Sequence, residues 1–174
     1  RANRIEINRT WNNTRLGINL VHAGDPPTGV TPNDAGDVDT GANGLQNFPV
    51  ITSATWNGSS LGVVGTISSK AGAIYWINFY VSPSADASGN GEGQYFAGAI
   101  MVGPTNGAGL GNFSTGFAPA LSNDLALAAI APGWVVTASV WQQGAEESSE
   151  LSGAFPITIS SGSSISGTLY NDLN

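Results

Sequence analysis

The stretch "AIYWINFYVS", residues 73–82, is apolar at nearly every position. A strand with such a sequence buries both of its faces, so it belongs in the middle of a sheet that is covered on both sides. One cover is the core of a β-sandwich. We expect the other to be an N-terminal segment, a C-terminal tail or another subunit. The two faces consist of Tyr75, Ile77, Phe79 and Val81 on one side, and Ile74, Trp76 and Tyr80 on the other.

Similar runs lie on both sides of this stretch, at the spacing of an all-β sandwich. Turn signals such as Asn57-Gly58 and Asn106-Gly107 separate them. We therefore predict an all-β fold, an Ig-like antiparallel β-sandwich of about seven strands. The predicted strands cover residues 48–56, 60–69, 73–82, 94–103, 110–118, 133–143 and 149–160. A short helix at 123–130 and a last strand at 164–170 are also expected.

Four parts are predicted along the chain. Residues 1–23 form an N-terminal strand segment, with alternating strands at 3–11 and 16–20. Residues 24–47 form an acidic joint loop, 48–160 the β-sandwich domain, and 161–174 a C-terminal linker or strand.

Composition excludes several classes of function. The 174 residues carry a net charge of −7, and beyond the first fifteen residues Lys70 is the only basic residue. The main body therefore lacks the clustered cations that bind nucleic acid. No apolar run approaches the length of a membrane span, so we expect no membrane insertion. With Cys at 0, neither a disulfide scaffold nor a thiolate metal site exists. Low charge with much Gly, Ser, Thr and Asn indicates a secreted or cell-surface protein.

The loop "GVTPNDAGDVDTGANGLQNFPV", residues 29–50, contains three Asp and no basic residue. Carboxylate and amide oxygens from flexible loops are the ligands that Ca²⁺ prefers. We predict a structural Ca²⁺ site here. The alternative is a loop whose Asx turns cap its own backbone. The candidate ligands are Asp34, Asp37 and Asp39, with Asn33 and Asn43 as additional oxygen donors.

A second stretch spaces oxygen donors by two residues. Asp86, Ser88, Asn90 and Glu92 make it a further candidate Ca²⁺ loop. A long hairpin loop is the stronger interpretation of these residues.

The sequence contains no motif of a catalytic triad. His22 is the only histidine and no GxSxG elbow accompanies it, so we expect a non-enzymatic protein. Five Trp leave another function open, because an exposed pair would stack on sugar rings. Trp56 and Trp141 are the best candidates for exposure, and the alternative places all five in the core or in interfaces.

Three motifs, in order, resemble a module of bacterial right-handed parallel β-helix surface proteins. They are "NTRLGINL" at 13–20, "VSPSADASGNGEGQYFAG" at 81–98 and "EESSELS" at 146–152. In that family a last β-helix rung precedes a β-sandwich, so residues 1–23 resemble a terminal rung. The resemblance implies that Glu150 makes a buried structural contact. Ala85 stands where relatives have Cys, so their disulfide cannot form.

The C-terminal "SISGTLYNDLN", residues 164–174, resembles the start of the B-type domains of serine-aspartate repeat adhesins. Together the two resemblances imply a piece of a longer protein, cut from neighbouring modules. An end without its neighbour would pair with another chain, so we expect a homo-oligomer or polymer formed by strand addition. Its interface would use Ile5, Ile7 and Trp11. The alternative is a monomer whose ends fold back on their own sandwich.

These observations lead to a functional prediction. We expect a structural module of an extracellular or cell-surface protein, such as an adhesin stalk, a surface layer or a filament, with structural calcium. The alternative is a carbohydrate-binding module beside a β-helix polysaccharide-active enzyme, with polysaccharide as the partner.

Overall fold

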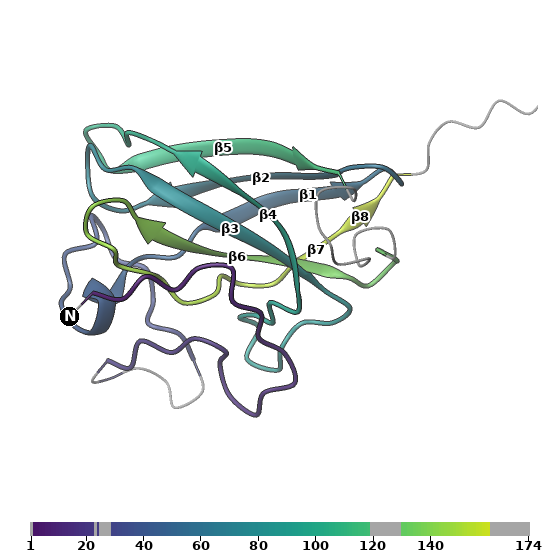
Figure 1. The fold of residues 1–174 in the computed structure, drawn as a ribbon, viewed down its shortest axis with the longest axis horizontal. Coiled ribbons are helices and arrows are strands. Elements are labelled where there is room, and N and C mark those ends of the chain that lie inside the picture. Colours follow the sequence, from purple (N-terminus) through teal and green to yellow (C-terminus); the bar gives the residue numbers. More distant parts are fainter. Residues whose placement is uncertain (1, 23, 25–28, 119–129, 161–174) are drawn as a thin grey trace, which may run out of the picture.

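The computed structural model describes residues 2–22, 24, 29–118 and 130–160. It confirms the all-β prediction, because two four-stranded sheets pack as a β-sandwich (Figure 1). One sheet has the order β5-β2-β1-β8 and the other the order β4-β3-β6-β7. The strands are β1 (Val50–Trp56), β2 (Leu61–Ser68), β3 (Tyr75–Ser82), β4 (Tyr95–Val102), β5 (Leu110–Phe117), β6 (Val135–Gln142), β7 (Phe155–Pro156) and β8 (Thr158–Ile159).

Strand β3 occupies the central position that its sequence predicts, with β4 and β6 as antiparallel neighbours. Its inward face joins the core between the sheets, where Phe79 lies against Phe113 and Phe117 with ring centroids 5.5 and 5.2 Å apart. Strands β1 to β6 each begin and end within two residues of the predicted ranges. Each strand directs alternate side chains into this core, which explains that agreement.

The predicted strand at 149–160 is wrong in length, because only β7 and β8 form there, with two residues each. Serine hydroxyls explain the interruption. Ser149 Oγ accepts a hydrogen bond from Val140 N at 3.0 Å, and Ser152 Oγ accepts one from Ala138 N at 2.9 Å. Because these side chains take the place of main-chain carbonyls beside β6, the chain follows the strand without forming a regular ladder.

The N-terminal arm, defined here as residues 2–22, also differs from prediction. The strands expected at 3–11 and 16–20 do not form; the arm contains one isolated bridge, between Thr10 and Gly93. Ile7 and Asn12 adopt positive φ values of 56° and 57°, which interrupt an extended chain. Of the helix expected at 123–130, only Ile130 is described, and it is not helical; the strand expected at 164–170 lies outside the described part of the chain.

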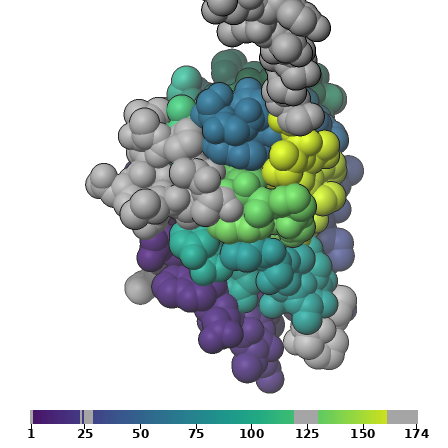
Figure 2. Space-filling view, turned by 90° about the vertical axis from the view of Figure 1, so that its right-hand side faces the viewer, coloured from purple at the N-terminus to yellow at the C-terminus, as the bar shows by residue number. Residues whose placement is uncertain are grey.

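The arm covers the outer face of the β4-β3-β6-β7 sheet, running beside β6 (Figure 1). The Arg4 guanidinium lies 3.7 Å from the ring centroid of Trp141, and Ile5 N donates a hydrogen bond to Ser148 Oγ at 2.7 Å. Tyr80, on this face, is only 2% exposed. Of the three covers expected for the second apolar face, the N-terminal segment of the same chain is therefore the one found among the described residues. In Figure 2 the arm, in purple, lies against the teal surface.

Candidate functional site

The acidic loop lies between the arm and β1 and is held by amide side chains. Asn33 makes two hydrogen bonds with Phe48, because its Nδ2 donates to the carbonyl oxygen and its Oδ1 accepts from the amide, each at 2.8 Å. Asn47 accepts from Asp34 N at 3.0 Å and donates to the carbonyl oxygens of Asp34 and Ser68. The loop is thus fixed to the start of β1 and the end of β2.

Three carboxylates meet inside this loop. One oxygen each from Asp34, Asp37 and Asp39 lies within 4.8 Å of the others. Gly36 and Asp37 have positive φ values of 79° and 56°, so the chain turns back and brings the flanking carboxylates together. Asp34 Oδ2 also accepts a hydrogen bond from Val38 N at 3.1 Å. The acidic triad is therefore built by the local turn.

Electrostatics within the triad disfavour the charged forms. Burial is the largest cause of the raised pKa of Asp37, and it outweighs hydrogen bonds from Asn47 N and Ser69 Oγ and the charge of Lys70. Burial also raises the pKa of Asp39, followed by the charges of Asp34 and Asp37. These directions show that the fold holds the negative charges of Asp37 and Asp39 at a cost.

One nearby cation partly balances these charges. Lys70 Nζ lies 3.7 Å from Asp37 Oδ2 and 2.8 Å from Glu147 Oε2, so its charge is shared between the triad and another carboxylate. His22 lies close enough to Asp39 for its charge to lower the pKa of that carboxyl slightly. Lys70 alone does not remove the net negative charge that three carboxylates produce.

The donor set fits a calcium ion. Two oxygens bound to one Ca²⁺ at 2.3–2.6 Å lie at most about 5 Å apart, which matches the separations within the triad. In addition, Asp34 Oδ1 and Asp39 Oδ1 are buried and have no hydrogen-bond partner among the described residues. Buried carboxylate oxygens without donors are costly, and a cation between them would satisfy both.

The two predicted amide ligands are engaged elsewhere. Asn33 Oδ1 accepts from Phe48 N, and Asn43 Oδ1 accepts from Asn3 N at 2.7 Å. Asn43 also donates to the carbonyl oxygens of Asn3 and Ser148. Asn43 lies in η1, the short 3₁₀ helix Ala42–Leu45. These two residues hold the loop and the arm in place.

The second oxygen-rich stretch forms a turn. Asp86 Oδ1 accepts from Ser88 N at 2.7 Å, and Ser88 Oγ accepts from Asn90 N at 3.1 Å. Asn90 Nδ2 donates to Leu151 O, and Glu92 Oε1 accepts from Asn13 N at 3.3 Å. Within the described residues, the triad is the acidic or histidine group of three or more whose ligand atoms converge, and this stretch does not contribute to it.

Glu150 makes the buried contact that the resemblance implies. The residue is 1% exposed, and its two carboxylate oxygens accept hydrogen bonds from Leu20 N and Thr31 N, each at 2.7 Å. One side chain thereby holds the end of the arm and the start of the acidic loop against the sandwich. Glu146 is partly exposed, and its carboxylate lies 3.8 Å from the Arg4 guanidinium.

The tryptophans differ from expectation. Trp56 and Trp141, the predicted exposed residues, are each 4% exposed, because Trp56 joins the core and Trp141 lies between Trp76 and Arg4. Trp11 is instead 47% exposed. The described residues therefore contain no exposed planar pair. Of the other interface candidates, Ile5 is half-buried against the sheet and Ile7 is exposed.

Sequence reasoning missed Asn47, Ser69 and Lys70, which support the triad from just before β1 and just after β2. The signal for Asn47 was its position at the end of the acidic loop, directly before an apolar strand.

Neither a known protein-family model nor a curated protein matches this chain. In the part of the chain that the structure describes, no helix has the length and apolarity needed to cross a membrane.

Proposed function

We propose that this chain is a non-enzymatic structural module of an extracellular or cell-surface protein, in which Ca²⁺ sets the joint between the arm and the β-sandwich. The observation that carries the proposal is the acidic triad, with its two buried, unpartnered carboxylate oxygens. The triad lies in the loop that connects the arm to β1. Binding of Ca²⁺ there would restrict the direction in which the chain enters the sandwich.

Calcium would act through a hydrogen-bonded frame that already exists. Asp37 Oδ1 accepts from Asn47 N at 2.9 Å, and Asp37 Oδ2 accepts from Ser69 Oγ at 2.8 Å. Stabilising the charged form of Asp37 therefore also strengthens the attachment of the loop to β2. The resemblance to the module that follows a β-helix rung supports the same role, because such a joint transmits orientation from one module to the next.

The test is thermal melting with calcium and with a chelator. With Ca²⁺ at a hundred times its dissociation constant, stability should rise by about 2.7 kcal/mol, or about 5–10 °C in melting temperature. Asp39→Asn should abolish the shift, and the control Asp86→Asn in the second loop should keep it. An unchanged midpoint, together with metal analysis that finds no bound calcium, would refute the proposal.

Assembly through strand addition remains part of the proposal, at a different edge from the one first expected. Strand β1 pairs with β8 only at Thr55 and Trp56, so its Val50–Ala54 portion lacks a described ladder partner on that side. An apolar groove of about 280 Å³ lies beside it, lined by Val50, Ile51 and Phe155 among others. A strand from a second copy would complete this edge.

Sedimentation tests this assembly. At high concentration and low salt, with Ca²⁺ present, we expect the protein to form oligomers. Val50→Lys, which places a charge at an exposed position of β1, should dissociate them. A full-length protein that sediments as a monomer under these conditions would rule out self-assembly.

A further inference from the structure

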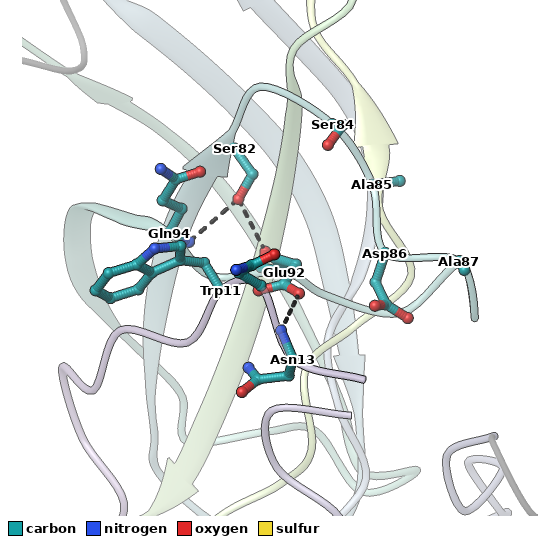
Figure 3. A pocket seen from close by; sticks show the side chains of 10 residues that line it. Trp11, Asn13, Ser82, Ser84, Ala85, Asp86, Ala87, Glu92 and Gln94 are labelled. Atoms are coloured by element: carbon teal, nitrogen blue, oxygen red, sulfur yellow. Dashed lines mark hydrogen bonds between the residues drawn. The ribbon is translucent and has the colours of Figure 1, made fainter. Parts of the chain in front are cut away.

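A polar pocket of about 400 Å³ lies between the arm and the loop that joins β3 to β4 (Figure 3). Its walls come from residues far apart in sequence, because residues 11–13 form one side and residues 82–87 form the other. The side chains that could contact a ligand there are Trp11, Asn13, Ser84, Asp86, Glu92 and Gln94.

The pocket is held open by hydrogen bonds beneath it. Thr10 and Gly93 exchange two backbone hydrogen bonds of 3.0 and 2.9 Å, which join the two walls. Asn13 N donates to Glu92 Oε1, and Ser82 Oγ donates to Glu92 O (Figure 3). A ligand would therefore meet a preformed surface, and little ordering would accompany its binding.

Trp11 supplies a flat apolar surface at the rim of the pocket. Its side chain is 47% exposed, whereas the core-facing Trp56 is 4% exposed. The Arg9 guanidinium lies 5.5 Å from the Trp11 ring centroid, which restrains the indole by a cation–π contact. An exposed, restrained indole beside polar groups suits a ligand with an apolar face and a polar edge. A sugar ring has this character, because its C–H bonds form a face and its hydroxyls an edge.

The polar groups of the pocket suit hydroxyl ligands. Hydrogen bonds from the side chain and the backbone of Ser88 lower the pKa of Asp86. The carboxylate is therefore ionised at neutral pH and is a strong hydrogen-bond acceptor. Glu92 Oε1 takes part in an exposed hydrogen bond with Asn13 N at 3.3 Å, and a carboxylate oxygen has a further lone pair that accepts from a hydroxyl. The amides of Asn13 and Gln94 both donate and accept.

The charge of the pocket restricts the ligand further. Among the described residues, its lining contains two carboxylates, Asp86 and Glu92, and no Lys or Arg. An anionic ligand such as a nucleotide, a sulfated sugar or a uronic acid would be repelled there. We propose that this pocket binds an uncharged sugar unit of a polysaccharide, with its ring stacked on Trp11 and its hydroxyls hydrogen-bonded to Asp86 and Glu92.

The test is an NMR titration with four neutral oligosaccharides: maltohexaose, cellohexaose, mannohexaose and xylohexaose. We expect at least one to shift the Trp11 indole N–H signal and the backbone N–H signals of Asn13 and Gln94 in a saturable way, with a dissociation constant of about 1 mM because the site is open on one side; the backbone signals report binding in the Trp11 variants. Trp11→Ala should weaken binding about tenfold or more and Asp86→Ala about tenfold. Trp11→Phe should retain part of the affinity, because it keeps an aromatic plate.

Met101 provides the matched control, because it is 55% exposed and lies on β4 outside the pocket. Met101→Ala should bind like the unmodified protein, and so should the unmodified protein with a chelator. The proposal is overturned by the absence of shifts with all four sugars, by equal binding in Trp11→Ala, or by tighter binding of polygalacturonate. Loss of sugar binding in the presence of a chelator would show that the sugar binds through a cation, which would overturn the proposed direct contacts. The proposal that calcium stabilises the fold would be unaffected by that result.

Discussion

The two faces of the β4-β3-β6-β7 sheet are closed in different ways. The inner face meets the other sheet through side chains such as Phe79, which is fully buried against two further aromatic rings. The outer face meets the arm, whose chain is irregular and is attached by polar contacts from Ser148 and Glu150. Apolar packing therefore closes one face of the sheet, and hydrogen bonds to an irregular chain close much of the other.

The difference has a consequence for stability. Asn78, on the outer face of β3, is fully buried, yet neither of its side-chain polar atoms has a partner among the described residues. Trp141 Nε1 is in the same situation. Each such atom costs about 1–3 kcal/mol, so we infer that the contact between arm and sheet opens at a lower free energy than the sandwich does.

The largest expected effect comes from comparing two adjacent residues of β3, Phe79 on the inner face of the sheet and Tyr80 on its outer face. Phe79→Ala should cost about 3–5 kcal/mol, because it leaves a cavity between two sheets that cannot close around it. Tyr80→Ala on the outer face should cost less, because the arm is able to move into the space. Urea denaturation of both variants measures the difference. Equal losses would show that the arm is as firmly packed as the core.

The same contrast explains what the sequence could predict. Strands β1 to β6 follow from a period of two and from turn signals, because each buries alternate side chains in one core. The attachment of the arm has no such period. Ile5 and Ser148 are 143 positions apart, and Leu20 and Glu150 are 130 apart. Single polar side chains that bind a distant backbone leave no pattern in the local sequence.

The candidate metal centre was predictable in part for a similar reason. Asp34, Asp37 and Asp39 are close in sequence, so one tight turn is enough to gather them. Asn33 and Asn43 have the same oxygen chemistry, but the backbone groups of Phe48 and Asn3 engage them instead. Composition identifies oxygen donors, and only the folded chain determines which of them remain for a cation.

A second prediction concerns Glu150, the main polar anchor of the outer layer. Glu150→Gln places an NH₂ group against one of two buried backbone N–H donors, at a cost of about 1–3 kcal/mol. Hydrogen exchange at Leu20 and Thr31 should become faster, while Val140 in β6 stays protected. The control Glu146→Gln, at a carboxylate that is partly exposed, should change stability by less than about 0.5 kcal/mol. Uniform loss of protection throughout β6 would contradict a local role.

The acidic triad gives a pH dependence of opposite sign with and without calcium. In the presence of a chelator, the raised pKa values of Asp37 and Asp39 mean that the folded protein binds protons more readily than the unfolded chain. The contribution of these groups to stability should therefore increase as pH falls from neutral through the raised values towards 3.8, the ordinary value. Calcium requires the ionised carboxylates, so its stabilisation should shrink over the same range.

Melting curves at several pH values, with calcium and with a chelator, measure both trends. Asp39→Asn with chelator should show a weaker rise on acidification than the unmodified protein. A calcium shift that stays constant across this pH range would contradict the assignment of the ion to these carboxylates.

The smallest expected effect tests the arm at its outermost contact. Arg4→Ala removes the guanidinium that lies 3.7 Å from the Trp141 ring, and because Arg4 is partly exposed the loss should be about 0.5–1 kcal/mol. Arg4→Lys should retain part of this energy, since it keeps the charge but not the planar group. Arg15 is exposed, so Arg15→Ala serves as the control for a lost positive charge. If the two alanine variants melt at the same temperature, the arm's stability arises from its backbone hydrogen bonds and not from the cation over the tryptophan.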